Sequence, residues 1–134
     1  TYDDEFFTFT TEGTVTQIGD TDNSIRGFAC YNHLIYAVTT SSDALYELDP
    51  STGATLSTQT ITLAGFTVEK GLGITANPTT GVLYALLKVQ GSSTRKLVTI
   101  DPTTGVATLI GDANDASGNA RFSSIAFHPA DPNC

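Results

Sequence analysis

The chain has no tryptophan, no methionine and only two cysteines among its 134 residues. Two cysteines are too few for a disulfide framework or a four-thiolate metal site. Basic residues are also scarce, since six Lys and Arg stand against fourteen Asp and Glu, and the formal net charge is -8. A surface of this sign repels polyanions, so we expect no binding to nucleic acid or to anionic membrane surfaces.

Long apolar runs are absent as well. No run approaches the ~20 residues that a membrane-spanning helix needs, which predicts no membrane insertion. The chain begins with Thr1 rather than Met, and no charged-then-apolar signal segment stands at its start, so we expect a processed or excised chain. The acidic, threonine-rich composition is typical of an exported protein and predicts an extracellular or cell-surface location.

The two cysteines, Cys30 and Cys134, leave two alternatives open. Both are unbonded thiols, or they form a disulfide within the chain or between copies, which requires an oxidising compartment. No Asn-x-Ser/Thr sequon with a permitted middle residue occurs, so any glycan would be O-linked to Thr or Ser.

An internal repeat organises the chain. One recurring unit reads LYELDPSTGATLS from Leu45, LVTIDPTTGVATLIGD from Leu97 and, with a degenerate turn, FFTFTTEGTVTQIGD from Phe6. A second recurring unit precedes these as GFACYNHLIYAV from Gly27, GLGITANPTTGVLYALL from Gly71 and, in part, SSIAFHPADP from Ser123. The spacing between equivalent residues gives a period of roughly 45 to 50, which is typical of stacked supersecondary units.

Local chemistry predicts that each unit is a β-hairpin. Apolar and β-branched residues alternate in short runs bounded by Gly, Pro, Asn, Asp and Ser. In Asp-Pro-x-Thr-Gly, the Asp side chain accepts hydrogen bonds from turn amides, Pro fixes φ, and Gly takes the position with positive φ. No segment shows a sustained helical stripe, so we expect no significant helix.

Four short antiparallel strands per period predict an all-β fold of β-propeller-type blades, with about three repeats in a single domain. We expect a partial blade over 1–20, full blades over 25–63 and 70–112, and a partial blade over 121–134. The strand runs lie at Phe6–Ile18, Ile25–Ile61, Leu72–Ile110 and Ser123–Phe127.

The pattern GLGITANPTTGVLYAL followed by LVTIDPTTGVATLIGD resembles the repeats of extracellular β-propellers of the YVTN, NHL and quinoprotein-like superfamily. The resemblance covers nearly the whole chain and implies a fold rather than a function, because the superfamily includes enzymes, lectins, adhesins and surface-layer proteins. Its quinoprotein members carry tryptophan docking motifs that this chain lacks.

The chain begins with the third and fourth strands of a blade and ends on a first strand. Three blades are fewer than the roughly four to eight of closed propellers, so we expect copies to complete each other's blades as a ring or a filament. The strands assigned to this assembly contain Phe6, Phe7, Phe9, Phe122, Ile125 and Phe127. The predicted function is a non-enzymatic subunit of an extracellular filament, sheath or surface layer.

Two other functions remain open. One is a carbohydrate-binding, lectin-like propeller with a glycan partner, and the other is a fragment of a larger propeller protein. Tyr36 and Tyr84 occupy equivalent positions in Ile-Tyr-Ala and Leu-Tyr-Ala, which favours packing between blades over stacking on a sugar. We find no nucleophile elbow, zinc-binding His pair or phosphate loop, and therefore predict no enzymatic activity.

Two acidic loops, GDTDNS and GDANDASGN, echo each other. Clustered oxygen ligands in a Gly-containing loop suit Ca²⁺, but Asp and Asn also simply form turns. We expect no resident cofactor, with calcium as the alternative at Asp20, Asp22, Asp112 and Asp115. His33 and His128 lack companions at metal-ligand spacing, and Arg95 and Lys96 are predicted to be solvated charges.

Overall fold

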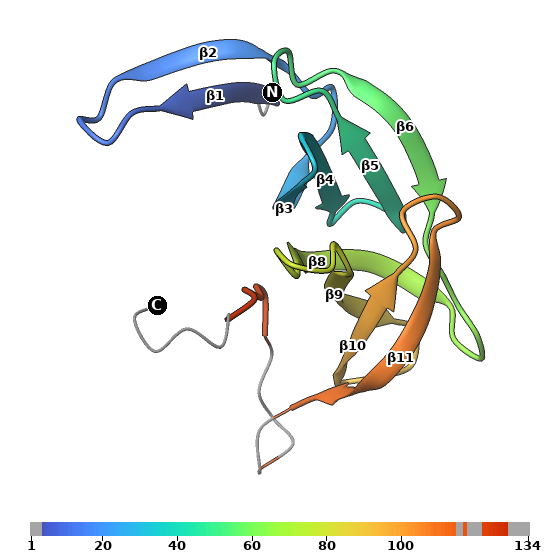
Figure 1. Ribbon diagram of the computed structural model, residues 1–134. Coiled ribbons are helices and arrows are strands. Elements are labelled where there is room, and N and C mark those ends of the chain that lie inside the picture. The colour runs from blue at the N-terminus through green and yellow to red at the C-terminus, as the bar shows by residue number, and fades with distance from the viewer. Residues whose placement is uncertain (1–3, 115–116, 118–121, 129–134) are drawn as a thin grey trace.

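The computed structural model describes residues 4–114, 117 and 122–128, and every regular element in them is a β-strand (Figure 1). The all-β prediction is therefore confirmed for these ranges. The strands form a two-stranded, a four-stranded and a five-stranded sheet, which follow one another along an open arc. Within the described residues, no helix is long and apolar enough to span a membrane.

The first sheet is a single antiparallel hairpin of β1 (Glu5–Phe9) and β2 (Val15–Asp20). Its turn is closed by the amide of Gly13, which donates to the carbonyl of Thr10 at 2.9 Å. Gly13 has a φ of 88°, a conformation that residues with a Cβ rarely adopt. The N-terminal unit of the repeat is thus a hairpin, as its sequence predicts.

The second sheet is an antiparallel meander in chain order. It contains β3 (Ile25–Tyr31), β4 (Leu34–Thr39), β5 (Ala44–Leu48) and β6 (Thr55–Thr60). The turn between β3 and β4 has two residues, Asn32 and His33, with φ of 51° and 62°. Two consecutive positive φ angles are what a two-residue hairpin turn needs to match the twist of its strands.

The third sheet has the strand order β7-β11-β10-β9-β8. Its strands are β7 (Thr62–Leu63), β8 (Val68–Ala76), β9 (Leu83–Val89), β10 (Arg95–Ile100) and β11 (Val106–Ala113). The strands from β8 to β11 pair antiparallel, whereas β7 pairs parallel with β11. The second and third sheets therefore each contain a four-stranded antiparallel meander.

Three turns use the predicted Asp/Asn-Pro chemistry. The side chains of Asp49, Asn77 and Asp101 each accept a hydrogen bond from the amide two residues later, at 2.7, 2.9 and 2.8 Å. The glycine four residues after each of them donates its amide back to the backbone carbonyl of that first residue, at 2.8 Å in all three turns. This repeated chemistry sets where each hairpin reverses.

The core lies between the four-stranded and five-stranded sheets. Val38 and Leu45 on one side and Leu87, Val89 and Val98 on the other are at most 2% exposed and belong to one apolar cluster. Alternation places these side chains on the inner faces, as in β10, where every second residue is buried. One apolar cluster thus joins the second and third sheets.

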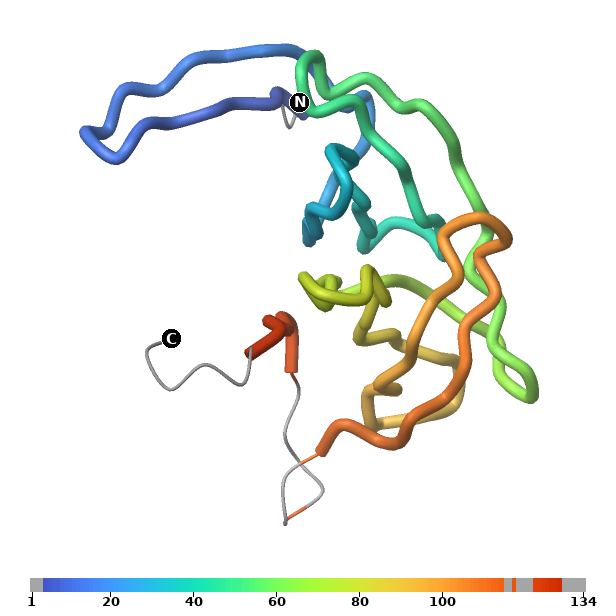
Figure 2. Tube along the Cα trace, in the orientation of Figure 1, coloured from blue at the N-terminus to red at the C-terminus, as the bar shows by residue number. Residues whose placement is uncertain are grey.

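The strands on the inner side of the arc pack backbone against backbone. β3 and β8 lie side by side, and the segment 122–128 lies next to β8 (Figure 2). A Cβ added to Gly27 would lie 3.2 Å from the Cα of Gly73, and one added to Gly73 would lie 3.0 Å from the Cα of Ser124. Small residues at these positions allow three successive units to approach closely.

The strand predicted at Ser123–Phe127 is not formed. Residues 122–128 contain no strand, although the amide of Phe127 donates to the Thr75 hydroxyl at 2.9 Å. A strand needs a backbone ladder on at least one edge, and this contact is to a side chain on β8. The sequence pattern is therefore that of a strand whose partner is missing from the described residues.

The strand β7 also departs from the prediction, which placed residues 62–63 with the preceding unit. Thr62 and Leu63 instead pair with Val106 and Ala107 of the following sheet. Ile61 and Leu63 are 1% and 5% exposed, so apolar burial holds the connecting chain against that sheet. The alternation of the sequence does not specify this partner.

Candidate assembly surface

Phe9, the last residue of β1, stands at a repeat position that is buried in both larger sheets. Its equivalents are Leu48 and Ile100, because all three pair with the residue two places after the turn glycine. Leu48 is 0% and Ile100 4% exposed, but Phe9 is 81% exposed. Phe9 thus has the apolar character of a core residue without the neighbouring strands that would cover it.

The rest of the hairpin shares this exposure. Phe7 on β1 and Val15 on β2 are also exposed, and the sheet contains no third strand in the described residues, so both outer edges of the hairpin are unpaired. An isolated two-stranded hairpin is marginally stable in water, and free apolar edges favour pairing with another chain. The hairpin is therefore the surface best suited to association.

Phe6 is the member of this strand that packs within the chain. Its ring lies 5.7 Å from the ring of Phe28, centroid to centroid. A Cβ on Gly53 would lie 2.9 Å from the Cβ of Phe6, so the turn after β5 rests directly on this side chain. Phe6 anchors the hairpin to the second sheet, which leaves Phe7 and Phe9 free for an external contact.

The opposite end of the chain is covered only in part. Phe127 lies 6.0 Å from the ring of Tyr84, and Ile125 is half-buried, whereas Phe122 is exposed. Figure 1 shows the hairpin at one end of the arc and this segment on the inner side of the arc, next to β8. The β1–β2 hairpin and the segment 122–128 are therefore two incomplete parts of the repeat that lie apart within one chain.

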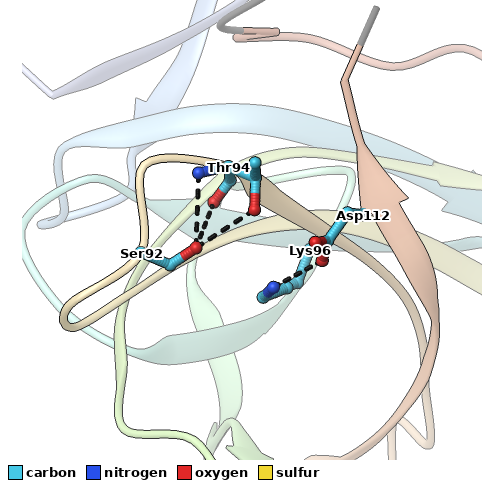
Figure 3. Close-up of polar contacts among 4 residues, drawn as sticks. All are labelled: Ser92, Thr94, Lys96 and Asp112. Atoms are coloured by element: carbon cyan, nitrogen blue, oxygen red, sulfur yellow. Dashed lines mark hydrogen bonds and ion pairs between the residues drawn. The ribbon is translucent and has the colours of Figure 1, made fainter. Parts of the chain in front are cut away.

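Lys96 on β10 is buried, contrary to the prediction that it is a solvated charge. Its ammonium group forms an ion pair with the carboxylate of Asp112 on β11 (Figure 3) and lies 5.0 Å from the centre of the Phe66 ring. The ion pair lowers the pKa of Asp112, mainly through the hydrogen bond from Lys96. In the preceding loop, the hydroxyl of Ser92 accepts a hydrogen bond from the amide of Thr94 at 3.3 Å.

Two of the four predicted calcium ligands, Asp20 and Asp112, have other partners in the structure. Asp20 accepts a hydrogen bond from the amide of Asp22 at 2.8 Å, which closes a turn, and Asp112 is paired with Lys96. Asp115 lies outside the described residues. Among the residues that are described, no group of three or more His, Cys, Asp or Glu side chains could hold a metal ion. Calcium binding at these positions stays an untested alternative.

The remaining sequence candidates lie apart from one another. Cys30 is an exposed free thiol, and Cys134 lies outside the described residues. His33 is exposed in the β3–β4 turn, as predicted. Tyr36 is 8% exposed within the apolar cluster, where burial, aided by the charge of Glu47, raises the pKa of its phenol. This burial confirms that Tyr36 packs between sheets.

No protein-family model matches the chain, and no curated protein sequence matches it. The repeat and the exposed surfaces described above are therefore the features that bear on function.

Proposed function

We propose that this chain is a non-enzymatic, secreted structural module of β-propeller type whose copies associate through their incomplete ends. The propeller assignment is supported by two successive four-stranded antiparallel meanders whose innermost strands, β3 and β8, lie side by side. The acidic, threonine-rich composition and the sequence resemblance support an extracellular filament, sheath or surface layer.

The exposure of Phe9 is the main observation in support of association between copies. The same repeat position is buried at Leu48 and Ile100 and is 81% exposed in the hairpin. Burying a phenylalanine side chain contributes about 1.5–3 kcal/mol, so covering Phe9 and its neighbours favours association.

A second copy is the occupant that best fits this surface. Its segment 122–128 has the sequence of an inner strand, lacks a backbone ladder, begins with the exposed Phe122 and lies next to β8. Placed beside the β1–β2 hairpin of a neighbour, it would extend an incomplete sheet by strand addition. Because the two surfaces differ, the contact runs head to tail and produces a ring or a filament.

The test is a measurement of mass by light scattering over a range of protein concentrations. The wild-type chain is expected to give multiples of 14.1 kDa, and negative-stain electron microscopy distinguishes rings from filaments. Phe9→Ser is expected to reduce the association constant by about tenfold or more, given the apolar area that it removes.

Leu56→Ser is the matched control. Leu56 is 53% exposed and lies on β6, which belongs neither to the β1–β2 hairpin nor to the segment 122–128. This variant should associate like the wild type. A folded wild-type chain that remains a 14.1 kDa monomer at every concentration would overturn the proposal.

A further inference from the structure

The contact between successive units has a defined geometry at the two places where the structure contains it. The turn after β5 rests on the first hairpin, where a Cβ on Gly19 would lie 1.6 Å from the carbonyl oxygen of Thr52. The turn after β10 rests on β6, where a Cβ on Gly105 would lie 2.3 Å from the carbonyl oxygen of Thr60. Each hairpin turn therefore docks on the end of the last strand of the preceding unit.

The end of β11 repeats the surface on which the first of these turns docks. Ile18-Gly19-Asp20 on β2 and Ile110-Gly111-Asp112 on β11 are identical in sequence. Gly19 pairs with Phe6 and Gly111 with Leu97, and in both hairpins the isoleucine before the glycine is the extra residue of a β-bulge. Bulges at equivalent positions shape the strand in the same way.

The two surfaces differ in how far they are covered. Ile18 is half-buried, while Ile110 is 52% exposed. A Cβ on Gly111 would meet nothing within 4 Å, in contrast to Gly19. The end of β11 is thus a preformed docking surface without an occupant among the described residues.

The matching turn is present in the same chain. Gly13 is the equivalent of Gly53 and Gly105, both of which contact the preceding unit, yet a Cβ on Gly13 would meet nothing within 4 Å. The β1–β2 turn is therefore the one of these three described turns whose docking face is free. The unoccupied surface and the unoccupied turn are complementary halves of one repeated contact.

We infer that the β1–β2 turn of a second copy, residues 10–13, docks on Ile110-Gly111 of this chain. The inference rests on the proposed self-association and specifies its interface. It also agrees in direction with strand addition, because the same neighbour would place its hairpin beside segment 122–128. Among the described residues nothing lies within 4 Å of a Cβ at Gly111, so the role of glycine at this position is to admit the incoming turn.

Gly111→Val tests this inference. The substitution lies in a strand and a Cβ there has open space. At a concentration at which the wild type is also monomeric, the variant is therefore expected to have the wild-type melting temperature and circular dichroism spectrum. Its association constant should fall at least tenfold, because the added side chain occupies the position of the turn. Ser93→Val, in the exposed loop after β9, is the control and should associate like the wild type.

Mixing two variants tests the head-to-tail direction. Phe9→Ser impairs the hairpin surface and Gly111→Val the β11 surface, so each should be a monomer alone. An equimolar mixture should form a dimer of twice the 14.1 kDa chain mass through the two intact surfaces. A Gly111→Val protein that associates like the wild type, or a mixture that stays monomeric, would overturn the inference. A monomeric wild type would instead overturn the proposed function.

Discussion

Lys96 combines burial with a positive charge. The residue is 7% exposed, yet its ammonium group reaches the carboxylate of Asp112 and the face of Phe66. A buried cation is tolerated when it is paired, and the stem of the lysine packs as an apolar chain. The three contacting residues come from separate parts of the sequence, so the alternation of β10 alone could not reveal this burial.

Asp112→Asn should lower the melting temperature at neutral pH, because it leaves the buried ammonium of Lys96 without its counter-charge. The pKa of Asp112 is lowered from its ordinary value of 3.8 in the folded protein. Its contribution to stability is therefore present above that value and is lost as the pH falls through the folded-state pKa. The difference in melting temperature between wild type and variant should be largest above about pH 5 and vanish in strong acid.

Glu69→Gln provides the comparison for the loss of an ion pair. Glu69 pairs with Lys88, and both side chains are about a third exposed, at 30% and 34%, whereas the side chain of Lys96 is only 8% exposed. Ion pairs between partly exposed side chains contribute about 0–1 kcal/mol, so this variant should lower the melting temperature at neutral pH less than Asp112→Asn does. Equal losses in the two variants would contradict a special role for the Lys96–Asp112 pair.

At the scale of the element, substitutions at two turn glycines distinguish the cost of backbone strain from the cost of disturbing a contact between units. Gly13→Ala and Gly105→Ala both place a Cβ at positive φ, 88° and 73°, which costs about 1–2 kcal/mol. Only Gly105 adds a clash, since its Cβ would lie 2.3 Å from the Thr60 carbonyl.

We therefore expect Gly105→Ala to lower the free energy of unfolding clearly more than Gly13→Ala in chemical denaturation, measured at a concentration at which the chain is monomeric. Equal losses would mean that the turn after β10 does not rest on β6 in solution.

The elements differ in how far the sequence predicts them. Hairpins and turns are predictable because Asp49, Asn77 and Asp101 form their hydrogen bonds within five residues of chain. The sequence does not predict the parallel pairing of β7 with β11, because the two strands lie far apart along the chain. It also does not predict the absence of a strand at Ser123–Phe127, because a strand needs a neighbouring backbone and the described residues supply none. The assembly surface was predictable as a set of strands, whereas the free contact at Gly111 required knowledge of which turn packs on which strand.

At the scale of the whole molecule, the contact between a hairpin turn and the last strand of the preceding unit occurs twice within the chain. The β1–β2 turn and the end of β11 are the two parts of such a contact that have no counterpart among the described residues. The internal copies bury Gly19 beneath one turn and place Gly105 against β6, while Gly13 and Gly111 remain open. Under the proposed self-association, such a chain would be stabilised by its neighbours as well as by its own core. Its stability in solution should consequently depend on its concentration.

The melting temperature of the wild type should rise with protein concentration, because association binds the folded state and not the unfolded one. At a free concentration of about 100 times the dissociation constant, this linkage contributes about 2.7 kcal/mol, which corresponds to a shift on the order of 10 °C. Gly111→Val lacks the docking surface, so its melting temperature should not change over the same range. Calorimetry of both proteins across at least a hundredfold range of concentration measures this difference. Parallel shifts in the two proteins would instead indicate association through surfaces other than β11.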